Sequence, residues 1–324
     1  METTKIGIVG YGNLGKGVEA GLKNSEDLEL VGIFTRRQPD QLETASPAYH
    51  MDDLDGFKGK IDVLILCGGS QKDIPVQAPE LAKTFNTVDT YDNHNEIPNH
   101  FRELDKSAQE NNTVAVISTG WDPGLFSLNR LFAESILPKG ETYTFWGPGL
   151  SQGHSDAVRR VPGVKSAVQY TVPKEELVDA VKNKESVDYD KLSAHRRVVY
   201  LVLEEGANEN NVKETIVTMP DYFEGYETEV NVIDQDIFDK EHSGMPHGGT
   251  VLRQGKTTNE HTSVYQFGLD LESNPEFTAA VAIAYARAAG KLAREKQYGA
   301  KTVFDIAPGY LSPKSPEDLR KELL

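Results

Sequence analysis

A glycine-rich stretch near the start of the chain constrains the fold more than any other feature. Gly10-Tyr-Gly-Asn-Leu-Gly15 comes directly after the apolar residues 5–9 and directly before residues 16–23, which we expect to be helical. In a strand–turn–helix unit the first glycine allows the tight turn, the second lets the backbone approach a pyrophosphate, and the third lets the helix pack against the strand. The N-terminus of the helix then faces the anion. The motif predicts a dinucleotide-binding unit of the Rossmann type.

The segments that follow alternate in the way such a unit requires. We predict further strands at residues 28–34, 60–67, 85–90 and 112–119, because these runs are almost continuously apolar. Such runs are typical of strands buried on both faces, as in a parallel sheet covered by helices. Residues 73–85 and 98–112 are long enough for crossover helices. The fold class predicted is α/β, with a Rossmann-type parallel sheet.

The pattern changes after about residue 121. Several later runs alternate apolar and polar residues, which is typical of an antiparallel sheet with one wet face. We predict strands at residues 141–147, 166–172, 196–206, 212–219, 228–234, 248–255 and 261–271. Residues 146–164 are expected to be mostly loop, and a helix is expected over 274–296, with Asn274 as N-cap. We therefore expect residues 1–121 with about 275–324 to form the dinucleotide-binding domain. Residues from about 122 to 274 are expected to form a second α+β domain on a mostly antiparallel sheet.

Composition narrows the function classes. The 34 basic residues stand against 50 acidic ones, a net charge of −16, spread along the chain. This argues against nucleic acid or an anionic membrane as a partner.

Cys67 is the only cysteine, so no intrachain disulfide can form. No apolar run approaches the roughly 20 residues that span a bilayer, and the start lacks a secretory pattern. We expect a soluble, cytoplasmic protein, and no metal, since His242 and His247 have no thiolate or acid cluster nearby.

Two arginines indicate which cofactor is bound. An NAD site usually carries an acid at the end of the second strand, where it binds the ribose hydroxyls. Here that end reads Thr35-Arg36-Arg37, which would hold a 2′-phosphate through charge-assisted contacts. The sequence therefore favours NADP. The alternative is a solvated basic turn.

Three polar loops follow the third, fourth and fifth predicted strands. They are 67–70, 90–92 and 118–122, and ligands of open parallel sheets lie outside the carboxyl ends of the strands. We therefore expect the loops to converge, with Cys67 as a packing residue because no base lies near it in sequence. Asp92 and Asp122 would bind an ammonium group or accept a proton there. Alternatively, Asp92 caps the next segment and Asp122 belongs to a turn.

At this point the chain closely resembles the meso-diaminopimelate D-dehydrogenase family. The resemblance runs from near residue 6 to beyond 274, and its matching segments are "VGYGNLG", "VGIFTRR", "TVDTYDNH", "STGWDPG", "TFWGPGLSQGHSDAVRR", "AVQYT", "TMPDYFEGYE" and "GMPHGG". It implies reversible, NADP-dependent oxidative deamination of the D-configured centre of meso-2,6-diaminopimelate, in lysine biosynthesis. The products would be L-2-amino-6-oxopimelate and ammonia. It also implies a homodimer formed through the second domain.

The resemblance also assigns site residues. Asp92, Asp122, Trp146, Gln152 and Gly153 would surround the reacting end of the substrate, and Thr171, Arg197, His247 and Asn274 would hold the distant L-centre. The cofactor would contact Gly10, Tyr11, Gly12, Asn13, Leu14, Gly15, Thr35, Arg36, Arg37, Cys67, Gly68, Gly69, Ser70, Thr90, Tyr91, Asp92, Ser118, Thr119, Gly120, Trp121 and Asp122.

These assignments agree with the chemistry of the residues. A substrate with two ammonium and two carboxylate groups needs acceptors for the first and donors for the second, and Arg197 can clamp a carboxylate bidentately. Asp92, Asp122 or a water between them would take the proton, and the residues leave this choice open. Each residue also has a purely structural interpretation. Arg197 could be the exposed start of a strand, Trp146 could belong to the ordinary core, and Asn274 could only cap a helix.

Other functions stay open at this point. One is another NADP-dependent D-amino acid dehydrogenase, and another is a non-enzymatic NADP-binding sensor. A sugar-type oxidoreductase would be expected to carry Glu-Lys-Pro and a dihydrodipicolinate-type reductase a paired histidine, and neither sequence occurs.

Overall fold

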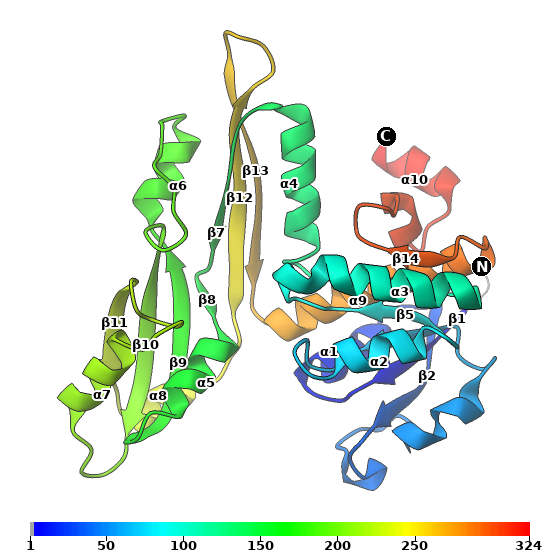
Figure 1. Cartoon of the computed structure of the whole chain (residues 1–324), viewed down its shortest axis with the longest axis horizontal. Coiled ribbons are helices and arrows are strands. Elements are labelled where there is room, and N and C mark those ends of the chain that lie inside the picture. Colours follow the sequence, from blue (N-terminus) through cyan, green and yellow to red (C-terminus); the bar gives the residue numbers. More distant parts are fainter. Residues whose placement is uncertain (1–2) are drawn as a thin grey trace. The chain divides into compact units, whose positions relative to one another are not determined.

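The computed structural model describes residues 3–324 and divides into two compact units. The first unit contains the residues up to Leu128 together with Pro275–Leu324, and the second contains Asn129–Asn274. The labels of Figure 1 are used for the helices and strands below.

A seven-stranded parallel sheet forms the centre of the first unit (Figure 1). Its strand order is β14-β6-β5-β4-β1-β2-β3, and all of its pairs are parallel. The predicted Rossmann-type sheet is therefore confirmed. The three-residue strands β3 and β14 were not predicted, because three residues are too few to show a pattern. The strands are β1 Thr4–Val9, β2 Leu28–Thr35, β3 Ala48–His50, β4 Val63–Leu66, β5 Asn86–Asp89, β6 Val114–Val116 and β14 Gly299–Lys301.

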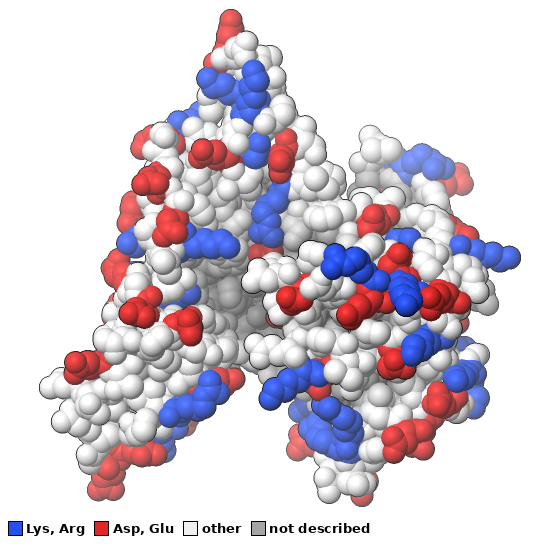
Figure 2. Space-filling model, in the orientation of Figure 1, with Lys and Arg blue, Asp and Glu red and all other residues white. Residues whose placement is uncertain are grey.

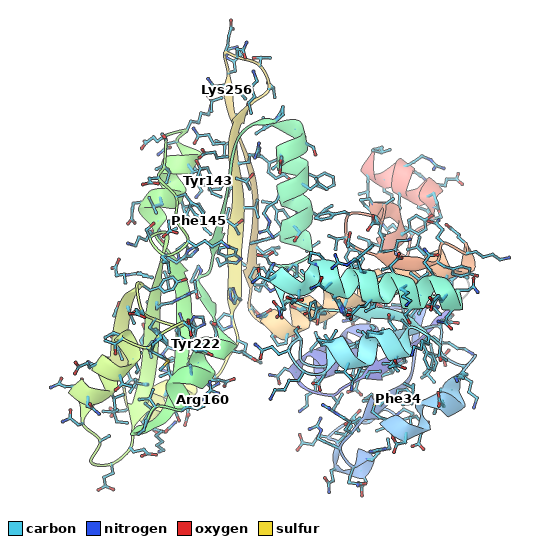
Figure 3. All side chains as sticks on the ribbon, in the orientation of Figure 1. Phe34, Tyr143, Phe145, Arg160, Tyr222 and Lys256 are labelled. Carbon is cyan, nitrogen blue, oxygen red and sulfur yellow. The ribbon has the colours of Figure 1, made fainter. Side chains whose placement is uncertain are left out.

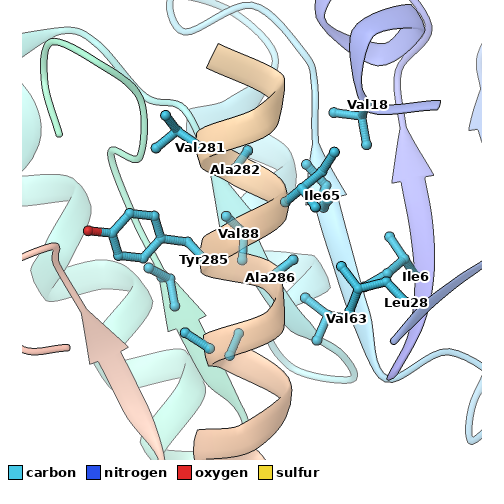
Figure 4. Packing of buried hydrophobic residues seen from close by; sticks show 14 of the residues in the cluster. Ile6, Val18, Leu28, Val63, Ile65, Val88, Val281, Ala282, Tyr285 and Ala286 are labelled. Atoms are coloured by element: carbon cyan, nitrogen blue, oxygen red, sulfur yellow. The ribbon is translucent and has the colours of Figure 1, made fainter. Parts of the chain in front are cut away.

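Helices pack against this sheet, and the long α9 fills the core on one side of it. Figure 4 shows Val281, Ala282, Tyr285 and Ala286 of α9 close to apolar residues of the strands. Alanines on α9 leave room for close packing, and a Cβ on Gly17 of α1 would lie only 3.1 Å from the Cβ of Ala279. The helices of this unit are α1 Asn13–Leu22, α2 Ile74–Leu81, α3 Ile97–Asn111, α9 Asn274–Arg294 and α10 Pro316–Leu323.

Two separate sheets build the second unit. Their strand orders are β11-β10-β9-β8 and β13-β12-β7, and every pair is antiparallel except β10–β11. The predicted mostly antiparallel architecture is confirmed. The strands are β7 Lys139–Trp146, β8 Gly149–Leu150, β9 Val164–Pro173, β10 His195–Leu203, β11 Glu227–Val232, β12 His247–Lys256 and β13 Thr262–Leu271. The helices are α4 Leu125–Ile136, which begins in the first unit, α5 Gln152–Arg159, α6 Glu175–Lys182, α7 Glu209–Val217 and α8 Gln235–Glu241.

Two aromatic side chains of β7 lie on the same face of its sheet, although burial does not alternate along the strand, since Thr144 between them is also buried. Tyr143 and Phe145, two residues apart, are 4% and 1% exposed, and Figure 3 labels both on this strand. Both rings meet Tyr189 edge-on, with centroids 5.4 and 5.6 Å apart. The period of two therefore places both aromatic side chains on the buried face of the sheet.

Two sequence predictions in this unit were wrong. Residues 212–219, predicted as a strand, lie mostly in helix α7. The side chain of Asn208 caps this helix by accepting from the backbone N–H of Asn211, and Val212 and Ile216, four residues apart, are both buried. Their β-branched side chains suggested a strand, whereas their spacing fits a helix. Residues 146–164, predicted as mostly loop, contain β8 and α5. Eight residues with glycine near the start carry little helical signal, and packing on β9 stabilises them.

Charged side chains of both signs are interspersed on the face seen in Figure 2. None of the helices within residues 3–324 combines the length and the apolar composition needed to cross a bilayer.

An ion pair joins distant parts of the first unit. Arg287 of α9 contacts Asp27 through two nitrogens, at 2.5 Å for Nε–Oδ2 and 2.9 Å for Nη2–Oδ1, and also donates to the carbonyl of Leu311. The two side chains are 8% and 18% exposed. Hydrogen bonds from Arg287 hold the pKa of Asp27 below its usual value, against the opposing effect of burial. The pair therefore ties α9 and the C-terminal segment to the loop before β2.

We predict that Asp27→Asn lowers the free energy of unfolding at pH 7 by about 3 kcal/mol, because it leaves a mostly buried guanidinium without its charge partner. A carboxylate whose folded pKa is depressed contributes fully above its unfolded pKa of about 3.9 and loses that contribution as the pH falls through the lower folded pKa. Urea unfolding between pH 7 and pH 3 measures the difference, which should shrink toward acid. Glu80→Gln, which breaks an exposed ion pair with Lys83, is the control and should have little effect.

Candidate active site

A cleft of about 440 Å³ lies in the first unit at the carboxyl ends of β1, β2 and β4. Most of its walls were predicted from the sequence. The predicted cofactor residues that line it are Gly10, Tyr11, Gly12, Thr35, Arg36, Arg37, Cys67, Gly68 and Gly69. The lining residues that sequence reasoning did not assign to the cofactor are Val9, Phe34, Met51, Asp73 and Gln77.

Each glycine of the turn has its own structural role. Gly10 has φ +91°, in the region that favours glycine, and a Cβ on Gly15 would lie 2.3 Å from the Gly10 carbonyl oxygen. The start of α1 can therefore approach β1 only because Gly15 has no side chain. Gly12 differs, because a Cβ there would meet no atom within 4 Å. The backbone at the N-terminus of α1 is thus open toward an anion.

Both arginines at the end of β2 are held at the cleft. Nη2 of Arg36 lies 2.7 Å from Oδ1 of Asp73, and the other oxygen of Asp73 accepts from the backbone N–H of Gly69 at 2.9 Å. Arg37 donates through Nη2 to the carbonyl oxygen of Tyr11, and its backbone N–H donates to Thr35 Oγ1 at 3.1 Å. Both arginines are nevertheless exposed, the side chain of Arg36 to 68%.

Tyr11 is fixed against the wall of the cleft by a buried acid. Its hydroxyl donates to Oε2 of Glu19, while Thr44 and Ser46 donate to Oε1 at 2.6 and 2.5 Å. Burial raises the pKa of Glu19, but these three hydrogen bonds outweigh it and leave the pKa below its usual value. Burial and the bond to Glu19 raise the pKa of Tyr11. Tyr11 therefore stays a neutral donor at pH 7.

The three predicted loops come together at the carboxyl ends of β4, β5 and β6. The backbone N–H of Asp92 donates to Ser70 Oγ at 3.2 Å, and that of Ser118 donates to Asp89 Oδ1 at 2.8 Å. Asp92 is exposed and Asp122 is half-buried. The sequence reasoning missed Asp89, whose signal was an acid ending an otherwise buried strand.

Cys67 lies at the edge of this region. Burial raises the pKa of its thiol to about 12, so the thiolate is not populated at pH 7. Within residues 3–324, no three His, Cys, Asp or Glu side chains are grouped so that they could hold a metal ion.

The second unit contains a buried cation. Arg197 on β10 pairs across the sheet with Thr171 on β9, donates through Nη1 to Thr171 Oγ1 and lies 4.0 Å over the ring of Tyr226. It is 8% exposed, so the reading of Arg197 as an exposed strand start was wrong. Among the described residues its Nε has no hydrogen-bond partner, and no carboxylate lies within 4 Å. Burial lowers the pKa of Arg197, and burial together with the Arg197 charge lowers that of His154 to about 4.

Trp146, at the end of β7, is held by a histidine. Its backbone N–H donates to His195 Nε2 at 3.0 Å, and His195 Nδ1 lies 2.9 Å from the carbonyl oxygen of Lys191. The first bond requires Nε2 to accept, so Nδ1 carries the proton. Burial lowers the pKa of His195, consistent with a neutral ring. No motif pointed to His195, because Trp146, the predicted site residue that it contacts, lies 49 residues away in the sequence.

One loop brings three further predicted residues together. Nε2 of Gln152 lies 3.0 Å from Sδ of Met245, and the carbonyl of Met245 accepts from the backbone N–H of Asn274 at 2.9 Å. His247 follows two residues later and packs so closely on β8 that a Cβ on Gly149 would lie 2.3 Å from its Nδ1. Met245 was also missed by the sequence reasoning. Gly153, beside Gln152, is exposed and faces open space.

Comparisons with known proteins show which family the chain resembles. Residues 120–273 match the family model for the diaminopimelic acid dehydrogenase C-terminal domain. The chain is 54% identical to the meso-diaminopimelate D-dehydrogenase of Lysinibacillus sphaericus, with both chains covered completely. A solved DAP dehydrogenase from C. glutamicum in complex with DAP is 46% identical, with full coverage of both chains and a TM-score of 0.91. A solved engineered D-amino acid dehydrogenase bound to NADP+ is 44% identical, with a TM-score of 0.86 and coverage of 99% of this chain and 100% of that one.

Identity of this order over the whole length of both chains shows that the protein belongs to the meso-diaminopimelate D-dehydrogenase family.

Proposed function

We propose that the protein catalyses the reversible, NADP-dependent oxidative deamination of meso-2,6-diaminopimelate at its D-configured centre. The products are L-2-amino-6-oxopimelate, ammonia and NADPH. The observation that carries this proposal is the guanidinium of Arg197, which is 8% exposed and has no carboxylate partner among the described residues. Burying an unpaired charge is expensive, so such a group is expected where an anionic ligand completes the pair.

The substrate offers the charges that these residues lack. Its two carboxylates need donors, which Arg197 and Thr171 supply at the L-centre, with hydrogen bonds added by His247 and Asn274. Its ammonium group at the D-centre needs acceptors, which are Asp92 and Asp122. The other residues proposed for the reacting end are Trp146, Gln152 and Gly153.

The cleft of the first unit fits NADP. The open space over Gly12 suits a pyrophosphate, because an anion there would lie at the N-terminus of α1. Thr35, Arg36 and Arg37 would hold the 2′-phosphate, and the loops 67–70, 90–92 and 118–122 would take the nicotinamide half. The solved relative that carries NADP+ supports this choice. When bound, the cofactor supplies the acceptor for the hydride that leaves the substrate carbon.

The residues of this chain then have two tasks. They would hold the reacting carbon of the substrate about 3–3.5 Å from the atom that accepts the hydride, with one face of that carbon turned toward the acceptor. They also accept protons from the ammonium group and from the water that replaces it. Asp92, Asp122 or a water bound between them performs the second task. Because both ends of the substrate are held, only the D-centre is presented for reaction.

We further propose a homodimer, a cytoplasmic location and a role in lysine and diaminopimelate biosynthesis. The first unit would be the dinucleotide-binding domain and the second would bind substrate and mediate dimerisation. Support for dimerisation comes from α4, where Leu131, Phe132 and Ile136 are 41%, 43% and 57% exposed. Large apolar side chains gathered on a surface are typical of a protein interface.

We predict that the purified protein reduces NADP in the presence of meso-diaminopimelate and does so far more slowly with NAD. The LL-isomer has no D-centre and should not react. Absorbance of the reduced nicotinamide measures the rates for the meso-, LL- and DD-isomers. A protein that binds NADPH but turns over none of them would be a sensor, and one that prefers simple D-amino acids would be a different dehydrogenase.

We predict that the double variant Arg36→Ala, Arg37→Ala raises the KM for NADP by roughly 100-fold, because each charge-assisted contact to a phosphate contributes about 1.5–3 kcal/mol. The KM for NAD should change little, since NAD has no 2′-phosphate. Initial rates over a range of each cofactor give both constants. Lys23→Ala, at the other end of α1, is the matched control for loss of charge. Equal losses for both cofactors would contradict the assignment.

We predict that Arg197→Met and Thr171→Ile weaken the use of meso-diaminopimelate and permit simpler apolar D-amino acids, because they remove the donors for the distal carboxylate. Ratios of kcat/KM across a panel of D-amino acids measure this change. Arg196→Met is the control, since this neighbouring arginine is exposed. If both variants kept the substrate ranking of the parent, the carboxylate assignment would be wrong.

A further inference from the structure

A buried acid and a buried histidine lie behind the loops that carry Asp92 and Asp122. Asp89 is the last residue of β5 and His100 lies on α3, with Nε2 of the histidine 2.7 Å from Oδ2 of the acid. Their side chains are 1% and 2% exposed. The ring of His100 stacks on Tyr91, with centroids 4.3 Å apart. Neither Asp89 nor His100 has a task in the proposed reaction.

Asp89 holds both loops at once. Its Oδ1 accepts from the backbone N–H of Tyr91 at 3.0 Å and from that of Ser118 at 2.8 Å. Its backbone carbonyl accepts from the N–H and from the hydroxyl of Thr119, at 2.9 and 2.8 Å. One residue therefore fixes the chain directly before Asp92 and also at the start of the loop that ends in Asp122.

His100 completes the arrangement. An ionised carboxylate can only accept, so the hydrogen bond requires the proton on Nε2. Nδ1 of His100 has no hydrogen-bond partner among residues 3–324. With the single ring proton on Nε2, Nδ1 is an acceptor, and an unpaired acceptor is less costly than an unpaired donor. His100 thus holds Oδ2 and leaves Oδ1 free to bind the two loops.

The backbone of Ser118 explains why this support is needed. Ser118 has φ +55°, in the left-handed region that residues with a side chain seldom adopt. Such a conformation persists where surrounding contacts impose it. The charge-assisted bond from its N–H to Asp89 supplies that contact.

We propose that Asp89 is a positioning residue of the dehydrogenase site. It sets the two loops so that Asp92 and Asp122 meet the reacting end of the substrate. This inference rests on the proposed function, because it assigns those aspartates to catalysis. The carboxylate acts through the backbone and does not contact substrate.

The test compares Asp89→Leu with Asp89→Asn. Leucine removes both carboxylate oxygens of residue 89, so the two loops lose their common support. We expect kcat to fall on the order of 10²-fold per folded molecule, the loss expected when catalytic groups are misplaced by about 1 Å. NADPH affinity should fall less than kcat. The contacts proposed at Gly12, Arg36 and Arg37 do not involve Asp89, and only the loops proposed for the nicotinamide half would shift. Asparagine keeps an oxygen for Tyr91 and Ser118, while its amide donates to His100 in the other tautomer. It should therefore recover most of kcat. If the leucine variant does not fold, Asp89→Ala, which also removes both carboxylate oxygens, takes its place.

Asp105→Leu is the matched control. Asp105 on α3 also accepts a backbone N–H, that of Ala300 at 2.9 Å, but it contacts neither loop. Its loss should lower the melting temperature and leave kcat per folded molecule unchanged. If Asp89→Leu behaved in the same way, or if Asp89→Asn lost as much kcat as leucine, the positioning role would be overturned.

Hydrogen exchange separates this inference from the proposed function. The amides of Tyr91 and Ser118 should exchange roughly 10-fold faster in Asp89→Leu, whether or not the parent protein turns over substrate. Unchanged exchange would overturn the positioning role alone. A parent protein inactive on meso-diaminopimelate would overturn the proposed function alone.

Discussion

A guanidinium buried without an acid is the constraint on which the proposed site depends. A protein interior accepts an isolated charge only at a high cost in free energy, so the surrounding structure has to hold Arg197 in place. The pairing of β9 with β10 sets Thr171 opposite Arg197, and the ring of Tyr226 lies beneath the guanidinium. The missing partner is an anion that the chain itself does not provide. In the proposed reaction, the carboxylate at the L-centre of the substrate would be that anion.

The cleft of the first unit depends on the close approach of two backbone segments. The carbonyl of Gly10 and the start of α1 can meet only because Gly15 lacks a Cβ, and this contact aims the helix N-terminus at the cleft. The arginines after β2 extend the same cleft with positive charge, held by Asp73 and the Tyr11 carbonyl. An anionic cofactor therefore meets oriented backbone dipoles first and side-chain charge at its far end.

Much of this could be predicted from the sequence, and the physical reason is that the signals are local. The spacing of Gly10, Gly12 and Gly15 follows from turn geometry, and the long apolar runs indicate buried parallel strands. The helix α7 was missed because Val212 and Ile216 are β-branched, and a single buried pair about one turn apart is a weak sign of a helix.

The residues that support the site gave no comparable signal. His195, Met245 and Asp89 act through partners far away in the sequence, such as Trp146 for His195 and Ser118 for Asp89. For His195 and Met245, the neighbouring residues in the chain give no indication of these contacts. For Asp89 the only signal is an acid at the end of a buried strand, which does not identify its partners. Such contacts depend on tertiary packing, which a single sequence does not reveal.

The most direct test of the buried cation is a thermodynamic cycle of binding. Calorimetry with NADPH present, so that no oxidation occurs, gives the affinities of meso-diaminopimelate and of D-lysine, which lacks the distal carboxylate, for the parent protein and for Arg197→Met. The account predicts a coupling of about 1.5–7 kcal/mol between the guanidinium and that carboxylate, the range that double-mutant cycles give for close charge pairs at an interface. Purely additive losses, with no coupling, would contradict it.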